Sequence, residues 1–312
     1  MLTFGPIPSR RLGRSLGINN IPLKVCSYSC VYCQVGKTLV MQADRGAFYK
    51  SEDILKAVRE KIKRAKDKGE EIDYLTFVSD GEPTLDIDLG KKIELLRPLG
   101  FKIAIISNVS LITREDVRDD LCKADWVSLK IDTVDKDVWY EINRPHSSLQ
   151  LDEMLQAVLV FSDTFKGQIA TETMLIQGIN DSRDGIDRTA NFMAKLKNAK
   201  SYISIPTRPP TEKWVKPATE DTINIAYQTF KKKSIDVEYL IGYEGNAFAF
   251  TGNVEEDLLS ITSVHPMREE AVIEFLKKGE AEWALIERLI KEAKLVRIEY
   301  EGKKFYMRKL QI

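Results

Sequence analysis

Short apolar segments of strand character alternate along this chain with longer amphipathic segments, from residue 50 to about residue 240. The expected strands, with one more before the alternation begins, are Leu16–Asn19, Tyr74–Val78, Lys102–Ser107, Trp126–Ile131, Gln168–Ile176, Tyr202–Ile205 and Val237–Ile241. The expected helices are Glu52–Lys68, Leu89–Leu96, Arg114–Lys123, Leu151–Phe165, Ile186–Leu196 and Asp221–Lys233. Strands separated by helices favour a parallel sheet with right-handed crossovers. The pattern predicts an α/β fold and fits a partial barrel as well as an open doubly wound sheet.

The sequence changes in character after residue 242. Residues 246–265 contain turn signals and are interpreted as a linker with some strand or loop structure. Two helices are expected next, Pro266–Lys278 and Ala281–Lys294, followed by two strands joined at Glu301–Lys303. Helix, helix and hairpin is the order in the last part of a winged helix-turn-helix. We therefore expect a core domain over residues 1–245, the linker, and a winged-helix-like α+β domain over residues 266–312.

Composition and charge exclude several classes of protein. The 47 lysine and arginine residues balance 47 aspartate and glutamate residues, so no overall field attracts nucleic acid. The first residues lack the apolar core of a signal peptide, and no run approaches about 18 apolar residues. Three of the four cysteines lie close together, which is typical of metal binding in a reducing compartment. We expect a cytoplasmic protein that does not enter a membrane.

The clustered cysteines, Cys26, Cys30 and Cys33, form a Cys-x3-Cys-x2-Cys array. Thiolates are soft ligands that suit iron–sulfur clusters or zinc. Three closely spaced thiolates can hold three irons of a cubane and leave the fourth iron open to a small molecule. The alternative is a zinc site completed by Cys122, His146 or His265, although zinc loops more often pair cysteines as Cys-x2-Cys.

The array resembles the signature of the radical S-adenosylmethionine superfamily, including an aromatic residue, Tyr32, directly before the last cysteine. The resemblance implies a partial (β/α)6 barrel that binds a 4Fe–4S cluster through Cys26, Cys30 and Cys33, together with S-adenosylmethionine. In that superfamily the open iron chelates the methionine part of the cofactor. One electron then yields a 5′-deoxyadenosyl radical, which abstracts hydrogen from a substrate. A low-potential electron donor of the ferredoxin or flavodoxin type is also implied.

Further positions resemble parts of the superfamily that face the cofactor, as Tyr32 does. Gly81 and Glu82 resemble its Gly-Glu motif: Gly81 allows close approach of the backbone, and Glu82 offers an acceptor for the cofactor's ammonium group. Asn108, at the end of the following strand, matches another cofactor-facing position.

Polar residues alternate along two later strands. Ser128, Lys130 and Asp132 would point into a barrel, where Lys130 and Asp132 could instead form an internal ion pair. Thr171 and Thr173 alternate likewise, on a strand that borders the adenosine in the superfamily. We therefore expect Ser128, Lys130 and Thr173 to contact the cofactor.

Longer segments are similar to one branch of the superfamily, the iron–sulfur oxidoreductases related to archaeal tRNA wyosine synthases. The similarity spans about residues 3–245 and includes Gly5–Asn19, Gln34 and Gly36, Asp80–Leu85, Ile142–His146 and Thr173–Asp181. The wyosine synthases carry an additional cysteine cluster for a second 4Fe–4S centre. Only Cys122 remains here, inside an expected helix, and we interpret it as a small core residue. The resemblance implies the cofactor chemistry and leaves the substrate open.

Basic residues near the cysteines allow two interpretations. Arg10, Arg11 and Arg14 precede the cysteine loop, and Arg144 and His146 follow the strand that contains Lys130. They could recognise a phosphate or carboxylate of the substrate, or form ion pairs that fix loops at the barrel rim. The candidate catalytic residues are Arg144, His146 and Lys130.

The functional hypothesis is a radical enzyme that acts on an RNA base, a peptide or protein, or a small metabolite. The alternative is a non-catalytic iron–sulfur or zinc sensor whose C-terminal domain binds nucleic acid. Residues 266–312 contain 11 lysine or arginine residues and 9 aspartate or glutamate residues. This weak positive bias favours a tail that holds a peptide or protein, or covers the barrel, over one that binds phosphates.

Overall fold

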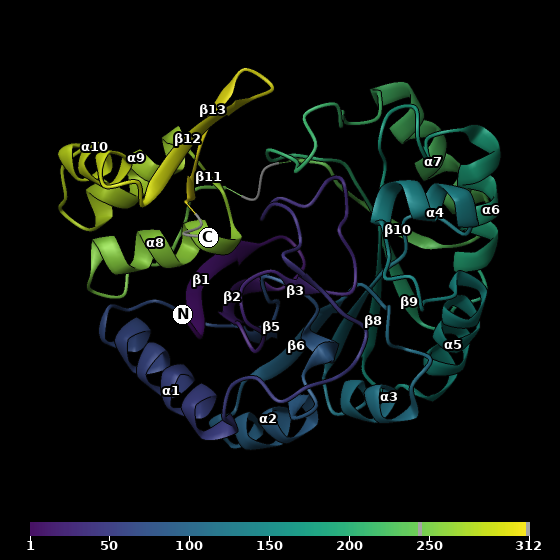
Figure 1. The fold of residues 1–312 in the computed structure, drawn as a ribbon, viewed down its shortest axis with the longest axis horizontal. Coiled ribbons are helices and arrows are strands. Elements are labelled where there is room, and N and C mark those ends of the chain that lie inside the picture. Colours follow the sequence, from purple (N-terminus) through teal and green to yellow (C-terminus); the bar gives the residue numbers. More distant parts are fainter. Residues whose placement is uncertain (243–244, 310–312) are drawn as a thin grey trace.

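The computed structural model describes residues 1–242 and 245–309, and its largest sheet has eight strands in the order β1–β2–β5–β6–β7–β8–β9–β10 (Figure 1). From β2 to β10 every neighbouring pair is parallel, whereas β1 is antiparallel to β2. The strands are β1 (Thr3–Ser9), β2 (Gly13–Ile18), β5 (Tyr74–Phe77), β6 (Lys102–Ser107), β7 (Trp126–Lys130), β8 (Gln168–Met174), β9 (Ala199–Ser204) and β10 (Asp236–Leu240). Two short strands, β3 (Val25–Cys26) and β4 (Val40–Met41), form a separate parallel pair.

Helices connect successive parallel strands and cover the outside of the curved sheet, as Figure 1 shows. They are α1 (Ser51–Asp67), α2 (Leu89–Leu96), α3 (Glu115–Leu121), α4 (Lys136–Asn143), α5 (Leu151–Thr164), α6 (Arg183–Met193) and α7 (Glu220–Lys232). Two single-turn 3-10 helices, η1 (Pro83–Leu85) and η2 (Arg97–Leu99), flank α2. This α/β architecture with a dominantly parallel sheet confirms the predicted fold class and is that of a partial barrel.

The sheet has a different core on each face because side chains alternate along a strand. On β7, Val127 and Leu129 belong to the large core shared with the helices. Trp126 instead lies in a smaller cluster on the inner face, with Ala104 of β6 and Tyr202 of β9. Ser128 and Lys130 therefore share the inner face with Trp126, as the sequence predicted.

Each of the seven strands expected from the sequence is present, but β1 was not predicted. Pro6 and Pro8 interrupt its sequence, and proline cannot donate to a strand ladder. The strand is tolerated because it lies at the edge of the sheet, where its register to β2 shifts between Phe4 and Ile7.

The C-terminal part forms a second hydrophobic core. Its elements are α8 (Val254–Val264), β11 (Met267–Arg268), α9 (Glu269–Lys278), α10 (Ala284–Lys291), β12 (Leu295–Tyr300) and β13 (Lys303–Arg308). The expected two helices and terminal hairpin are present, and β13 lies between β11 and β12 in an antiparallel sheet. Two boundaries need correction.

The prediction of strand or loop structure over residues 246–265 is wrong for its second half, which is helix α8. Asn253 caps this helix through a hydrogen bond from Glu256 N to Asn253 Oδ1 at 3.0 Å. The β-branched residues of this segment favoured a strand in the sequence analysis. In the structure the segment is helical, and Leu258 and Ile261 lie in the second core. The next helix begins at Glu269 and not at Pro266, because Met267 and Arg268 pair with β13.

A buried ion pair joins the two parts of the chain. Lys61 Nζ of α1 lies 2.6 Å from Asp257 Oδ1 of α8, and their side chains are 6 % and 2 % exposed. Thr251 Oγ1 also accepts a hydrogen bond from Lys61 Nζ at 2.9 Å. In residues 1–242 and 245–309, no helix combines the length and the apolar character needed to cross a bilayer.

Candidate active site

The cysteine loop, which we define as residues 26–36, lies at the carboxyl ends of the parallel strands. Segments that directly follow β5, β6 and β7 contact this part of the chain. Gly81 lies against the backbone just before Cys26, Asn108 is near the sulfur of Cys26, and Asp132 bonds to the side chain of Tyr32. This end of the strands is where open α/β sheets bind their ligands.

The backbone of the cysteine loop is held from two sides. On one side, the end of α4 accepts hydrogen bonds: Ser29 N donates to Asn143 O at 3.0 Å, and Val31 N donates to Ile142 O at 2.9 Å. On the other side, Val31 O accepts a hydrogen bond from Glu212 N at 3.0 Å. The loop is therefore held in place by residues far away in the sequence.

Amide groups point at two of the sulfurs. Asn108 Nδ2 lies 3.7 Å and the backbone N of Tyr28 3.5 Å from Cys26 Sγ, and Asn143 Nδ2 lies 3.5 Å from Cys30 Sγ. Burial raises the pKa of Cys26 far above its usual range and that of Cys30 to about 12. Since burial disfavours a bare thiolate, a bound metal centre is what would ionise these thiols. N–H···S bonds of this kind tune the reduction potential of an iron–sulfur cluster.

Gly81 brings the segment after β5 into direct contact with β3. A Cβ atom at this position would lie 1.8 Å from Val25 O, so a larger residue requires main chain to move. Gly81 thus lets the turn after β5 pack directly on the backbone that leads into Cys26, and a contact between Gly81 and the cofactor stays a prediction.

Glu82 is almost fully buried and accepts four hydrogen bonds. Three reach Oε1, from Thr84 N, Thr84 Oγ1 and Ser107 Oγ, and one reaches Oε2, from Asn108 N at 2.7 Å. Burial raises the pKa of this carboxyl group. Oε2 keeps the capacity to accept one further donor, so a bond from an ammonium group to Glu82 stays a prediction.

Three charged side chains meet on the inner face of the barrel. Glu172 of β8 lies 3.0 Å from Lys130 Nζ and 2.5 Å from Arg11 Nη1. Burial would raise the pKa of Glu172, but Lys130 and Arg11 outweigh burial and hold that pKa well below its usual range. Lys130 Nζ also lies 4.8 Å from the ring centre of Tyr32, which connects the charged group to the cysteine loop.

The expectation that Thr171 and Thr173 share the inner face with Lys130 is wrong. Lys130 pairs with Glu172 in the register of β7 and β8, so Glu172 takes that face and the two threonines point the other way. Thr173 Oγ1 donates to Ile131 O at 2.8 Å. Sequence reasoning missed Glu172 because register between distant strands is a tertiary property; alternation along β8 alone left two choices of face.

Tyr32 is anchored by the residue that follows β7. Its hydroxyl donates to Asp132 Oδ2 at 2.5 Å, and Asn143 Nδ2 donates to the same oxygen at 2.8 Å. The expected Lys130–Asp132 ion pair is therefore absent from the described residues: Lys130 forms an ion pair with Glu172, and Asp132 accepts hydrogen bonds from Tyr32 and Asn143. This arrangement fixes the ring next to the last cysteine.

A family model described as the radical SAM superfamily matches residues 20–193. The chain belongs to the radical SAM superfamily. It is 49% identical over 312 residues to a UPF0026 protein of Methanocaldococcus jannaschii. The alignment covers 99% of this chain and 97% of the relative. It is therefore also a member of the UPF0026 group.

Solved structures share the fold of this radical SAM chain. One is a radical SAM methyltransferase from Sphaerobacter thermophilus, with a TM-score of 0.59, 15% identity, and coverage of 73% of this chain and 66% of that one. Another is SuiB of Streptococcus suis bound to S-adenosylmethionine, with a TM-score of 0.53, 15% identity, and coverage of 71% and 49%. At this identity the likeness shows the fold alone.

Radical SAM proteins use a 4Fe–4S cluster and S-adenosylmethionine, and the chemistry of the cysteine loop fits the cluster. Among the described residues, no three His, Cys, Asp or Glu side chains are grouped closely enough for a single metal ion. A cubane takes each thiolate on a different iron. Cys30 and Cys33 are partly buried like Cys26, as ligands on one loop should be.

The residues expected to complete a zinc site have other surroundings. Cys122 is exposed at the end of α3, so its interpretation as a core residue is wrong: the side chain falls on the outer face of a short helix. His265 is buried, and its Nε2 lies 3.1 Å from Arg208 Nη2. The ring of His146 bonds to Ser148 Oγ at 2.8 Å.

Three of the basic residues named from the sequence, Arg11, Arg14 and Arg144, form ion pairs. Arg144 Nη1 lies 2.6 Å from Glu212 Oε1, and Glu212 is also the residue whose backbone holds Val31. Arg11 pairs with Glu172, and Arg14 with Glu71 at 2.8 Å. Of the two interpretations, fixing of loops describes these arginines as they stand, and a catalytic role for Arg144, His146 or Lys130 stays a prediction.

The C-terminal part reaches the cysteine loop. Gln34 Nε2 donates to Val264 O at 3.0 Å, and Gln34 Oε1 accepts from Arg208 Nη1 at 2.8 Å. In the terminal hairpin, Tyr300 OH donates to Pro206 O at 3.1 Å. The end of helix α8 thus contacts the cysteine loop, and the hairpin contacts the segment that follows β9.

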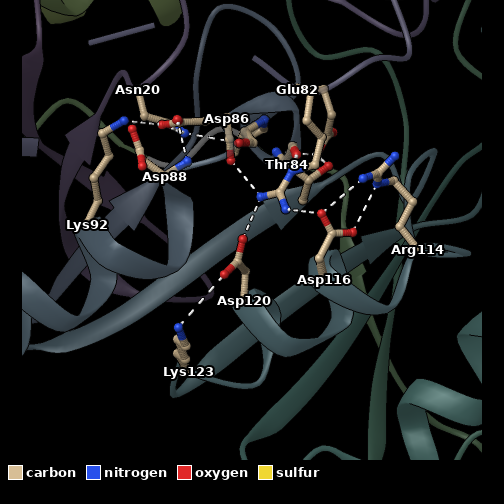
Figure 2. A network of polar contacts seen from close by, with 12 residues as sticks. Asn20, Glu82, Thr84, Asp86, Asp88, Lys92, Arg114, Asp116, Asp120 and Lys123 are labelled. Atoms are coloured by element: carbon tan, nitrogen blue, oxygen red, sulfur yellow. Dashed lines mark hydrogen bonds and ion pairs between the residues drawn. The ribbon is translucent and has the colours of Figure 1, made fainter. Parts of the chain in front are cut away.

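A buried polar network supports the segment that carries Gly81 and Glu82 (Figure 2). Lys92 and Asp86 form an ion pair at 2.5 Å with both side chains fully buried, and Asn20 Nδ2 donates to Asp86 Oδ2 at 3.0 Å. Arg45 Nε donates to Thr84 O at 3.0 Å, and Arg45 Nη2 lies 2.5 Å from Asp120 Oδ2. The network holds the turn after β5 through contacts to Thr84 and Asp86.

Replacement of Lys92 by methionine is expected to destabilise the protein by about 3–5 kcal/mol, because Asp86 would remain as an unpaired buried charge. Lys91→Met is the matched control: Lys91 is 57 % exposed and lies 3.6 Å from Glu52, so its loss should cost less than about 1 kcal/mol. Urea unfolding of both variants measures the difference. Equal stabilities would show that the Lys92–Asp86 pair does not hold this turn.

Proposed function

We propose that this protein binds a 4Fe–4S cluster through Cys26, Cys30 and Cys33 and reductively cleaves S-adenosylmethionine to abstract hydrogen from a substrate. The cluster and its cofactor supply a 5′-deoxyadenosyl radical when bound. The observation that carries the proposal is a cysteine loop fixed at the carboxyl ends of β5, β6 and β7 in a superfamily that uses these cofactors.

The side chains around the loop would bind and orient. Asn108 and Asn143 would keep their hydrogen bonds to the sulfurs of Cys26 and Cys30 and so adjust the reduction potential. We propose Tyr32, Gly81, Glu82, Asn108, Ser128 and Lys130 as the cofactor-binding set. Thr173 is the weakest earlier candidate, since its side chain points away from the inner face.

The C-terminal part is proposed to act as a winged-helix-like cover for the barrel. Its contacts to Gln34 and Pro206 support this role. The substrate class stays open among an RNA base, a peptide or protein, and a metabolite. The reaction needs a low-potential electron donor of the ferredoxin or flavodoxin type. We propose that this protein and its electron donor are cytoplasmic.

Anaerobic reconstitution with iron and sulfide tests the cofactor assignment. We expect about four irons per chain, and a reduced sample whose electron paramagnetic resonance signal changes when S-adenosylmethionine is added, because an open iron would bind the cofactor. A chain that takes up only zinc, or a cluster signal that is indifferent to S-adenosylmethionine, would contradict the proposal and favour a sensor.

A further inference from the structure

A cavity of about 410 Å³ lies between the barrel and the C-terminal part, outside the site described above. On the barrel side it is lined by Asn19, Tyr49 and Asp80, and on the other side by residues of α8 and of the terminal hairpin. Asn19 follows β2 and Asp80 follows β5, so the cavity also lies at the carboxyl ends of parallel strands. Pockets between domains and at this end of a sheet are common ligand sites.

Asp80 carries an unsatisfied oxygen at this cavity. The residue is only 5 % exposed. Its Oδ2 accepts a hydrogen bond from Asn19 Nδ2 at 3.0 Å, whereas Oδ1 is buried and has no hydrogen-bond partner in the described part of the chain. Burial raises the pKa of Asp80 to about 6, so the carboxylate is largely ionised at neutral pH. A buried carboxylate in this state lacks a donor.

The opposite wall of the cavity is cationic. Lys294, Arg308 and Lys309 line it. Lys294 is paired with Glu255 and Glu292. Arg308 and Lys309 form no ion pair with any acidic side chain within residues 1–242 and 245–309. Met1 also lines the cavity, and its amino group and Arg308 both act to lower the pKa of Asp80. An excess of cations over the single carboxylate matches a ligand with a dianionic group at one end, and Asp80 Oδ1 matches a donor at the other.

We propose that this cavity binds a small molecule that carries a protonated amine and a phosphate group. The amine would donate to Asp80 Oδ1, and the phosphate would lie between Arg308 and Lys309. Such a ligand would contact both parts of the chain at once, and its binding requires neither the iron–sulfur cluster nor S-adenosylmethionine.

Calorimetric titration of the full chain with O-phosphoethanolamine tests the site, with inorganic phosphate as the probe that lacks the amine. We expect the wild-type chain to bind O-phosphoethanolamine more tightly than phosphate. Asp80→Asn should remove this preference, with a loss of about ten-fold or more in affinity for O-phosphoethanolamine. Arg308→Gln should weaken binding of both probes. Lys303→Gln, on the same hairpin but outside the cavity lining, should leave both affinities unchanged.

Three results would overturn the proposal. One is no binding of either probe by the wild-type chain. Another is equal binding by the Asp80→Asn, Arg308→Gln and Lys303→Gln variants, which would show a non-specific charge effect. The third is competition by S-adenosylmethionine, which would place the ligand in the radical site. Because the titration needs no cluster, failure of the proposed radical function would leave its outcome unaffected.

Discussion

Replacement of Cys30 by alanine is expected to abolish cluster binding and reduce cleavage of S-adenosylmethionine to background. Cys30 is one of three thiols on a loop that offers no replacement ligand: His146 bonds to Ser148, and Cys122 lies exposed on α3. Two remaining thiolates would leave two irons of a cubane without protein ligands. Iron and sulfide content, together with 5′-deoxyadenosine formation, measures the effect.

Cys122→Ala is the matched control for this prediction. It removes a thiol of the same chain without touching the loop, and we expect iron content and activity to match the wild type. Retention of a full cluster by Cys30→Ala would show that a different set of residues binds the metal. Loss of the cluster in both variants would point to a general effect on folding.

Gly81→Ala is expected to reduce cluster content strongly although Gly81 binds no metal. The added methyl group would lie 1.8 Å from Val25 O, and the contact is with backbone and not with a side chain that can rotate. The turn after β5 cannot move easily, because Lys92 pairs with Asp86 and Arg45 donates a hydrogen bond to Thr84 O. The strain therefore falls on β3 and displaces Cys26, at a cost of about 1–3 kcal/mol in stability.

Gly46→Ala provides the comparison for Gly81→Ala. A Cβ atom at Gly46 would meet only the ring of Phe48 at 3.7 Å, which is ordinary contact. We expect Gly46→Ala to retain the wild-type iron content after reconstitution. If Gly81→Ala also retained it and unfolded at the same urea concentration, the close approach of the two backbones would have no role in forming the site.

The fold was largely predictable because the burial of one face of a strand or helix determines where its apolar residues lie in the sequence. The parallel strands turn apolar side chains toward the helices, as Val127 and Leu129 of β7 do, and the helices that follow them carry an apolar face. The failures have physical causes. The prolines in β1 argued against a strand at the edge of the sheet. The β-branched residues in α8 argued against a helix, but its packing against the second core overrides weak helix propensity.

The site was predictable where its chemistry is local in sequence. The spacing of the three cysteines and the Gly81–Glu82 pair are short motifs. Contacts between distant segments were not visible: Asn143 reaches Cys30 from the end of α4, and Glu172 meets Lys130 only through the register of β7 and β8. The wrong face expected for Thr173 follows from the same limit, since one residue of register exchanges the two faces of a strand.

The measurement that tests the central claim most directly is the formation of 5′-deoxyadenosine. The reconstituted chain would be incubated anaerobically with S-adenosylmethionine and dithionite, and the product measured by chromatography. We predict that 5′-deoxyadenosine accumulates with time, requires the reductant, and is absent with Cys30→Ala. An intact, reduced cluster that leaves S-adenosylmethionine uncleaved, even with candidate RNA, peptide and metabolite substrates present, would contradict the account.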